Sequence, residues 1–284
     1  MKDYSWLSAF LDISEAIFKN LYGKAGSEEM AASIGKGAGG DTTIQIDRSA
    51  EDIFIEKFES FNISAVIISE EAGKIFVNGG DDTSPIVLID PIDGSINAKR
   101  GLPFYSIAIA KTEKMISSTT VSVVMNLSNG DRFYAIKDRG AFKDNYFLTR
   151  HGKAAGQIKT NGDAKKEILI TEGIYEDAVL KEFLIYRKMF NKIRVFGSVA
   201  LDLSYLADSA ADGFVHPLDS RTFDYAAGKL ILEEAGGCLS NQNGEPFDAD
   251  VNLKKGSPFI AARNREILND MVKTKINFRE EKIV

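Results

Sequence analysis

Two acidic residues that follow a strongly apolar segment are the first candidates for chemistry in this sequence. Residues 86–89, Ile-Val-Leu-Ile, predict a buried strand, and Asp90 and Asp93 come directly after it. Gly94 and Ser95 follow and predict a turn into a helix. Carboxylates beside a turn suit a hard divalent cation, which prefers oxygen ligands, and the unpaired amides at a helix start suit a phosphate. The combination favours phosphoryl chemistry.

Further carboxylates are predicted where strands end or helices begin: Asp47, Glu70, Glu71 and Asp224. Side chains that leave neighbouring strand ends in one direction converge, which is how open sheets build ligand sites. A lone acid at a helix start is usually only a cap, and the Glu70-Glu71 pair alone would be solvated. Asp90 differs, because an acid that closes an apolar strand has a desolvation cost unless a cation pairs with it. Magnesium would be a suitable cation.

The residues from Asp90 to Asn97 resemble the signature of a known family. Their sequence, D-P-I-D-G-S-I-N, is similar to the D-P-I-D-G-[TS]-x-N motif of the inositol monophosphatase family, within the fructose-1,6-bisphosphatase superfamily. Residues 69–71 resemble the family's G-E-E, and residues 223–228 resemble its W-D-x-A-A-G. Residues 101–108 match the segment that comes after the first motif in members of the family. The four anchors occur in order between about residues 30 and 240.

This resemblance implies a magnesium-dependent, lithium-sensitive phosphomonoesterase with two or three Mg²⁺ per site and a layered αβαβα sandwich fold. By position, the implied metal ligands are Glu70, Asp90, the Ile92 carbonyl, Asp93 and Asp224. The backbone N–H groups of Gly94 and Ser95, together with Asp93, would receive the substrate. Glu70, or Ser95 with Asp47, would orient the attacking water and accept its proton.

Some positions depart from the usual family pattern. Ser95 replaces the commoner Thr and Phe223 replaces Trp, whereas Ala98-Lys99 replaces the usual aromatic residue. The four-residue spacing of Thr43 and Asp47 is similar to that of archaeal members. Those enzymes often hydrolyse both inositol 1-phosphate and fructose 1,6-bisphosphate, so the chain most resembles this archaeal dual type.

The same resemblance suggests substrate contacts in the second half of the chain. Arg194 precedes residues 197–201, Gly-Ser-Val-Ala-Leu, as the substrate arginine does in archaeal members, and Val199 within that segment is a further candidate. The second arginine of those enzymes is not in its usual place. Arg221 either replaces it or pairs with Asp219.

Residues 35–40 formally match G-x-G-x-x-G. A dinucleotide fingerprint needs a strand before it and a helix after it. Here a helical pattern precedes it and a strand-like alternation over residues 41–47 follows, so we expect a mobile loop. Lys36 in that loop could swing over the phosphate or simply be solvated.

The periodicity along the chain predicts two lobes, 1–152 and 153–284, with the boundary in the polar segment 152–166. The first is an α+β lobe that carries most of the metal ligands, and the second is an α/β lobe that supplies Asp224 and substrate contacts. In the first lobe we expect helices at 6–21 and from Ser49, strands at 65–68, 75–77, 86–89, 106–111 and 119–125, and a hairpin at 129–130. In the second we expect strands at 167–170, 193–196, 213–215 and 259–262 and helices at 179–190, from Ser198, and at 223–235.

Composition limits the class of protein. The chain has 284 residues, 44% of them hydrophobic and 27% charged, which is typical of a globular protein. A formal charge of −6 disfavours non-specific nucleic-acid or membrane-surface binding. Cys238 is the single cysteine and excludes an internal disulfide, and His151 and His216 are expected at the surface or in packing. Without a signal-like start we predict a cytoplasmic enzyme, and the resemblance implies a homodimer or a tetramer.

Other functions stay open at this stage. The same chemistry could act on 3′-phosphoadenosine 5′-phosphate or NADP, which related families use. A catalytically silent metal- or phosphate-binding regulator belongs to a different class, although every acid of the predicted site is present. A dehydrogenase built on the glycine-rich segment is the weakest alternative.

Overall fold

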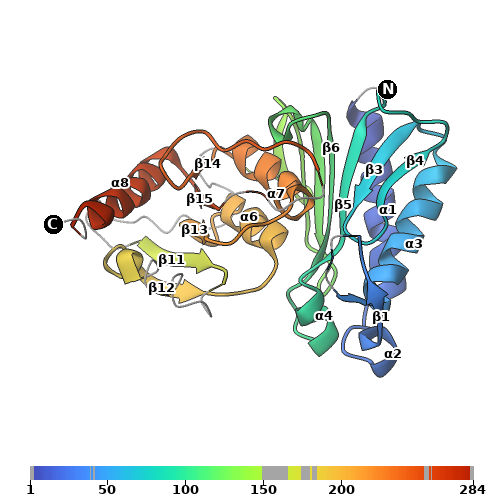
Figure 1. Cartoon of the computed structure of the whole chain (residues 1–284), viewed down its shortest axis with the longest axis horizontal. Helices are drawn as coiled ribbons and strands as arrows, with labels where there is room; N and C mark the ends of the chain where they lie inside the picture. The colour runs from blue at the N-terminus through green and yellow to red at the C-terminus, as the bar shows by residue number, and fades with distance from the viewer. Residues whose placement is uncertain are drawn as a thin grey trace.

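The computed structural model describes residues 3–38, 40, 42–148, 166–173, 180, 184–252, 256 and 258–281. They form five layers (Figure 1). Helices α1 (Asp3–Leu21) and α3 (Gln45–Ser60) cover the outer face of an eight-stranded sheet. Helices α6 (Val199–Ala207) and α7 (Thr222–Glu234) lie between this sheet and a five-stranded sheet, and α8 (Arg265–Glu281) packs on the far side of the second sheet. The predicted αβαβα sandwich is confirmed.

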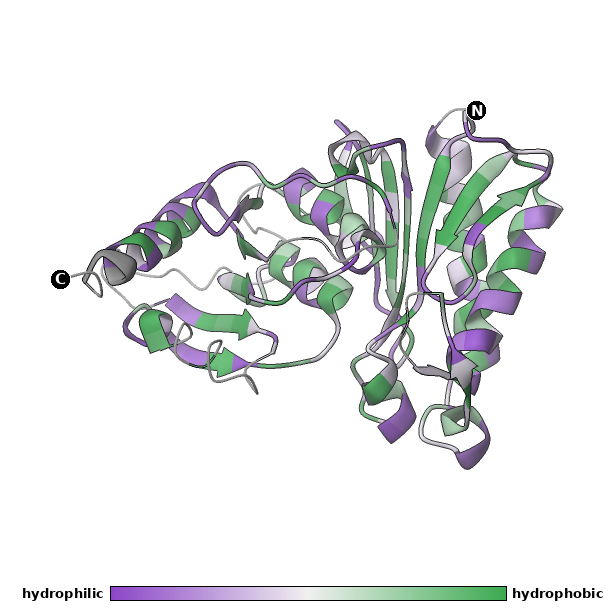
Figure 2. Cartoon of the chain, viewed as in Figure 1, coloured by the Kyte–Doolittle hydropathy of each residue, from purple (hydrophilic) through white to green (hydrophobic). Residues whose placement is uncertain are grey.

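The large sheet has the strand order β10-β9-β8-β7-β6-β5-β3-β4, in which only β3 and β5 run parallel. Its strands are β3 (Ala65–Ser69), β4 (Gly73–Val77), β5 (Ile86–Asp93), β6 (Ser106–Thr112), β7 (Val121–Asn126), β8 (Arg132–Ile136), β9 (Gly140–Lys143) and β10 (Tyr146–Leu148). Along β5, Val87 and Ile89 pack on the α1–α3 side, whereas Leu88 faces α6 and α7. Because both faces are covered, residues 86–89 of this strand are a continuous apolar run, and Figure 2 colours the strand as mainly hydrophobic.

The smaller sheet has the order β12-β11-β13-β15-β14. Its strands are β11 (Lys166–Thr171), β12 (Phe190–Arg194), β13 (Gly213–His216), β14 (Cys238–Asn241) and β15 (Phe259–Ala262). β11 pairs parallel with β12 and β13, and β15 is antiparallel to both of its neighbours. Cys238 is buried in the core between this sheet and α8, where it packs as a small apolar residue.

Short elements complete the described part of the chain. α2 (Glu28–Ala31) leads into β1 (Ser33–Lys36), which pairs antiparallel with β2 (Thr42–Ile44). α4 (Ser95–Arg100) follows β5, and two 3₁₀ turns are η1 (Ile116–Ser118) and η2 (Leu184–Lys188). Among the described residues, no helix combines the length and the apolarity needed to cross a bilayer.

Several predicted element boundaries are wrong. The second helix begins at Gln45 rather than Ser49, because Asp47 accepts the Ile44 N–H (2.9 Å) and so closes the first turn earlier. Part of the expected glycine-rich loop is strand β1, which β2 holds by pairing. Strand β12 starts at Phe190, three residues before the predicted strand, and neither β14 nor α8 was predicted. The predicted lobe boundary at 152 lies outside the described residues. The prediction of an α-helix over 179–190 is wrong for its second half, because residues 184–188 form the 3₁₀ turn η2 and Phe190 begins β12.

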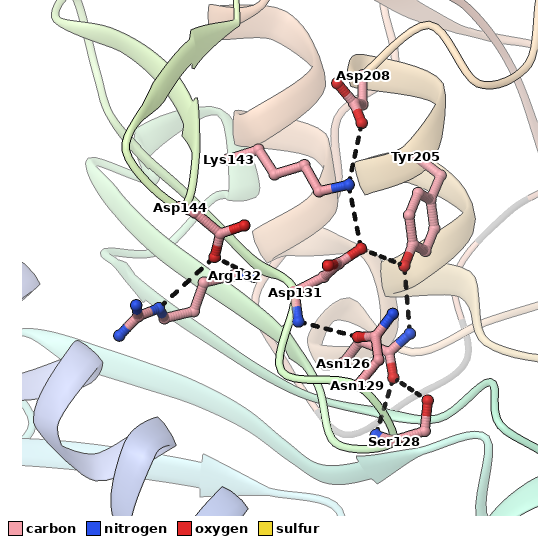
Figure 3. Close-up of polar contacts among 9 residues, drawn as sticks. All are labelled: Asn126, Ser128, Asn129, Asp131, Arg132, Lys143, Asp144, Tyr205 and Asp208. Carbon is pink, nitrogen blue, oxygen red and sulfur yellow. Dashed lines mark hydrogen bonds and ion pairs between the residues drawn. The ribbon is translucent and has the colours of Figure 1, made fainter. Parts of the chain in front are cut away.

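A polar cluster attaches the C-terminal end of α6 to the large sheet (Figure 3). Lys143 on β9 bridges Asp131 (3.0 Å) and Asp208 (3.2 Å), and Asp208 is the last residue of the α6 turn. The Tyr205 hydroxyl donates to Asp131 (2.8 Å) and accepts from the Asn126 amide (3.3 Å). Because these groups are only partly exposed, the cluster fixes where α6 lies on the sheet.

Candidate active site

The site is built around the C-terminal end of β5. This strand continues past Asp90 to Asp93, and its register against β6 shifts between these two residues. Asp90 is buried, and its Oδ1 accepts the Ile92 N–H (3.1 Å). Gly94 has φ +93°, and a Cβ there would lie 3.0 Å from the carbonyl oxygens of both Phe104 and Gly197. Only glycine therefore fits the turn that leads into α4.

Glu70 lies beside Asp90 because their strands are adjacent and parallel. Ser69 at the end of β3 pairs with Ile89 of β5, so Glu70, just beyond β3, and Asp90, still within β5, lie at neighbouring positions on the same edge of the sheet. Burial, and then the nearby Glu70 carboxyl, raise the pKa of Asp90 well above its ordinary value. Asp93 and Asp224 act in the same direction. The predicted convergence of acids from separate elements is therefore present.

Asp47 and Asp224 occupy equivalent positions in the first turns of α3 and α7. Asp47 accepts the Ile44 N–H (2.9 Å) and Asp224 accepts the Arg221 N–H (2.8 Å), so each also closes its own helix start. Burial raises the pKa of Asp47 to about 7, and the Glu71 carboxylate adds to this effect. Oδ1 of Asp47 is buried and accepts no hydrogen bond within the described part of the chain. Capping alone does not explain that orphaned oxygen.

Asp93 joins the large sheet to the start of α6. It accepts hydrogen bonds from the Ser198 hydroxyl (2.6 Å), the Val199 N–H (3.2 Å) and the Ala200 N–H (2.7 Å). Burial raises the pKa of Asp93 to about 7 although these donors oppose the shift. Ser198 is the N-cap residue of α6, where the helix was predicted to start, but its side chain donates to Asp93 rather than to its own helix. Val199 contacts the site through its main chain.

Two of the predicted metal ligands, the Glu70 carboxylate and the Ile92 carbonyl, interact with other side chains of the site. The Arg221 guanidinium forms an ion pair with Glu70 (Nη2–Oε1, 2.9 Å). The Ser95 hydroxyl donates to the Ile92 carbonyl (2.9 Å), and Ser95 also lies near enough to Asp47 to lower its pKa. Burial and the Asp224 charge raise the pKa of Glu70 to about 8 despite Arg221. Among the residues that the structure describes, no three Asp, Glu, His or Cys side chains are arranged as they stand to hold one metal ion.

The remaining predicted residues are Glu71, which lies near enough to the cluster of acids to raise the pKa of Asp47 and Glu70, together with Lys36 and Arg194. Glu71 accepts the Thr43 hydroxyl, and Lys36 is exposed on β1. Arg194 is exposed at the end of β12, where Nη1 donates to the Ile193 carbonyl (2.7 Å). It lines a cavity of about 230 Å³ with aromatic residues that include Phe104.

Two acids near the site were missed. Asp202 in α6 is fully buried, and its carboxyl group lies against that of Glu172. Burial, with Glu172 nearby, raises the pKa of Asp202 well above normal. Glu172 accepts the N–H of Gly197 (2.8 Å), in the turn before Ser198. The sequence signal was an acid inside the apolar run Leu-Asp-Leu, the same signal that singled out Asp90.

The fold and the site together define a five-layered α/β protein with a buried acidic site beside a glycine turn. The chain belongs to the inositol monophosphatase family, whose model matches residues 7–276. The chain is accordingly a phosphatase, a phosphoric monoester hydrolase, and enzymes of this family use divalent metals.

Individual relatives agree with this assignment. The chain is 31% identical over 280 residues to the fructose-1,6-bisphosphatase/inositol-1-monophosphatase of Methanothermobacter thermautotrophicus, covering 95% of this chain and 96% of that protein. It is 33% identical over 267 residues to the bifunctional NADP phosphatase/NAD kinase of Methanococcus maripaludis, covering 87% of this chain and 46% of that protein. The crystal structure of the extragenic suppressor protein suhB from Bartonella henselae has the same fold, with a TM-score of 0.78, 24% identity, and coverage of 95% and 98%.

Proposed function

We propose that this phosphatase depends on Mg²⁺ and hydrolyses inositol 1-phosphate, fructose 1,6-bisphosphate or both. The observation that supports the proposal most strongly is the concentration of buried acids whose charges raise one another's pKa. Such a group is costly in a folded protein unless cations neutralise it. The relative from Methanothermobacter, which aligns over nearly its whole length, carries both of these substrates in its name.

The donor set fits a hard divalent cation. It consists of carboxylates and one carbonyl, and magnesium prefers oxygen over the nitrogen of His216. The residues that would hold the ions are Glu70, Asp90, the Ile92 carbonyl, Asp93 and Asp224. Asp47 adds a buried oxygen that has no partner among the described residues, close to Glu70 and Asp90. When bound, the ions would supply Lewis-acid chemistry, lowering the pKa of water and stabilising negative charge.

The chain's own residues would position the substrate and move one proton. The N–H groups of Gly94 and Ser95 would bind phosphate oxygens. The close backbone packing at Gly94 keeps these N–H groups in position. Asp47, with a pKa of about 7, can accept a proton at Oδ1 near neutral pH. The Ser95 hydroxyl lies between the Ile92 carbonyl and Asp47 and would pass the proton of the attacking water to it. Glu70 is the alternative acceptor.

The direct test measures phosphate release from inositol 1-phosphate and fructose 1,6-bisphosphate with Mg²⁺ and with a chelator. Asp93→Asn should fold, because the amide oxygen can still accept hydrogen bonds from α6, and should lower turnover by at least about 100-fold. Asp138→Asn, an exposed residue in the β8–β9 turn, is the matched control and should retain turnover. Near-normal turnover in Asp93→Asn would remove that residue from the site.

A second substrate class has a specific observation in its favour. The relative from Methanococcus shows that this phosphatase domain also occurs in a protein named for NADP phosphatase activity. NADP and 3′-phosphoadenosine 5′-phosphate therefore belong in the substrate panel. Failure to release phosphate from every compound, with Mg²⁺ present, would favour the non-catalytic regulator instead. We further propose a homodimer, which sedimentation of the purified chain would test.

A further inference from the structure

Arg221 contacts two of the acids of the site at once. Its side chain pairs with Glu70 (2.9 Å), and its main-chain N–H donates to Asp224 (2.8 Å). The side chains of Arg221 and Glu70 are only 10% and 13% exposed. The guanidinium also lies over the Phe223 ring, 5.2 Å from its centre. The ion pair between Arg221 and Glu70 is therefore largely shielded from solvent, and contacts of both the main chain and the side chain keep Arg221 in place, unlike in an exposed surface ion pair.

The charges around Glu70 explain why the guanidinium of Arg221 lies beside it. Asp224, Glu71 and Asp47 all disfavour a second negative charge at this position, as does burial, whereas Arg221 favours it. A guanidinium 2.9 Å from Oε1 supplies the positive charge that the carboxylate needs. A magnesium ion on the same carboxylate would be about 2 Å from an oxygen. Two cations on one carboxylate would then lie within a few ångströms and repel each other.

We propose that Arg221 and the divalent cation compete for Glu70, so that the guanidinium must leave this carboxylate when the metal binds. Arg221 thereby sets the concentration of Mg²⁺ at which the site fills. Once released from Glu70, the guanidinium would be a cation beside the site and could bind the phosphate group of the substrate. Metal binding would therefore prepare the site for the substrate. The inference rests on the proposed function, because it takes Glu70 as a metal ligand.

The test is isothermal titration of the full chain with Mg²⁺ in the absence of substrate. Arg221→Gln should bind Mg²⁺ about ten-fold more tightly than the wild type, since a charge-assisted hydrogen bond to Glu70 no longer has to break. Arg139→Gln removes the same charge from an exposed turn and should change affinity less than about two-fold. Circular dichroism would show whether each variant is folded. Arg221→Lys, which keeps the charge but not the fork geometry, should give an intermediate affinity.

The outcomes separate this inference from the proposed function. Equal or weaker Mg²⁺ binding in both Arg221 variants, with a wild type that binds Mg²⁺, would overturn the competition alone. Absence of binding in the wild type and in both Arg221 variants would overturn the competition and the metal dependence together. Binding by Arg221→Gln at Mg²⁺ concentrations that leave the wild type empty would support the competition in its strongest form.

Discussion

His216 should make the stability of the fold depend on pH in a predictable direction. It ends β13, four residues before the loop reaches Ser220, whose hydroxyl bonds to Nε2 of the ring. The ring packs between Phe214 and Phe259, with centroids 5.7 and 5.0 Å away, and its Nδ1 has no partner among the described groups. Burial therefore disfavours the charged ring and lowers the pKa of His216 from 6.5 to about 4.

The sign and size follow from proton linkage. Between pH 6.5 and 4 the unfolded chain binds this proton and the folded chain does not, so the unfolding free energy falls as pH falls. A difference of about 2.5 between the two pKa values corresponds to about 3 kcal/mol in total. About 2 kcal/mol of this should be lost between pH 8 and pH 5.

The assay is urea denaturation of the wild type and His216→Gln at pH 8, 6.5 and 5, with a chelator and fixed ionic strength. The buried acids shift stability in the opposite direction, but they are present in both proteins and cancel in the difference. The wild type should lose about 2 kcal/mol relative to His216→Gln between pH 8 and pH 5. Ser220→Ala keeps the ring and should retain the pH dependence of the wild type. A wild-type-minus-variant difference that does not change with pH, or a ring that titrates near 6.5 by NMR, would refute the reasoning.

Two further predictions concern the acids and the turn. With a chelator present, raising the pH from 6 to 8.5 should lower the melting temperature, because the folded chain holds protons on Glu70, Asp47 and Asp93 that the unfolded chain has released. Mg²⁺ should weaken this dependence of the melting temperature on pH. The same dependence with and without Mg²⁺ would contradict the prediction. Gly94→Ala should destabilise the fold by about 1–3 kcal/mol and abolish activity, because both its φ and its space require glycine; Gly23→Ala, with a positive φ but open space, should cost less, and equal denaturation midpoints would argue against the steric part.

The elements that the sequence predicted well are those with a local pattern. The apolar run of β5, the hairpin after β7 and the start of α6 all depend on neighbours in the chain. Asp90 was singled out in the same way, because a carboxylate that follows an apolar strand is a local signal, and the structure places it beside Glu70 and Asp224. Where a contact between distant parts of the chain determines the local structure, the prediction from the local sequence pattern was wrong or missing. Pairing with β2 turns residues 33–36 into a strand, and neither Ser198 with Asp93 nor Arg221 with Glu70 has a sequence signal.

The attachment of α6 and α7 to the large sheet has a consequence for how the chain is made. The inner face of that sheet, which includes Ala108, Val124 and Phe133, is covered by helices that lie later in the sequence. The last strand of the sheet ends at Leu148, whereas α7 ends at Glu234. At about 5–20 residues per second, a ribosome needs roughly 4–17 s to synthesise the segment between them.

During that interval the sheet would present an uncovered apolar face to its surroundings. The large sheet therefore cannot complete its packing until α6 and α7 have been synthesised. A nascent chain stopped after β10 should bind holdase chaperones, whereas one stopped beyond α7 should release them. The order of residues in the gene thus delays the completion of the first sheet until Asp224, the last of the predicted site acids, has been added.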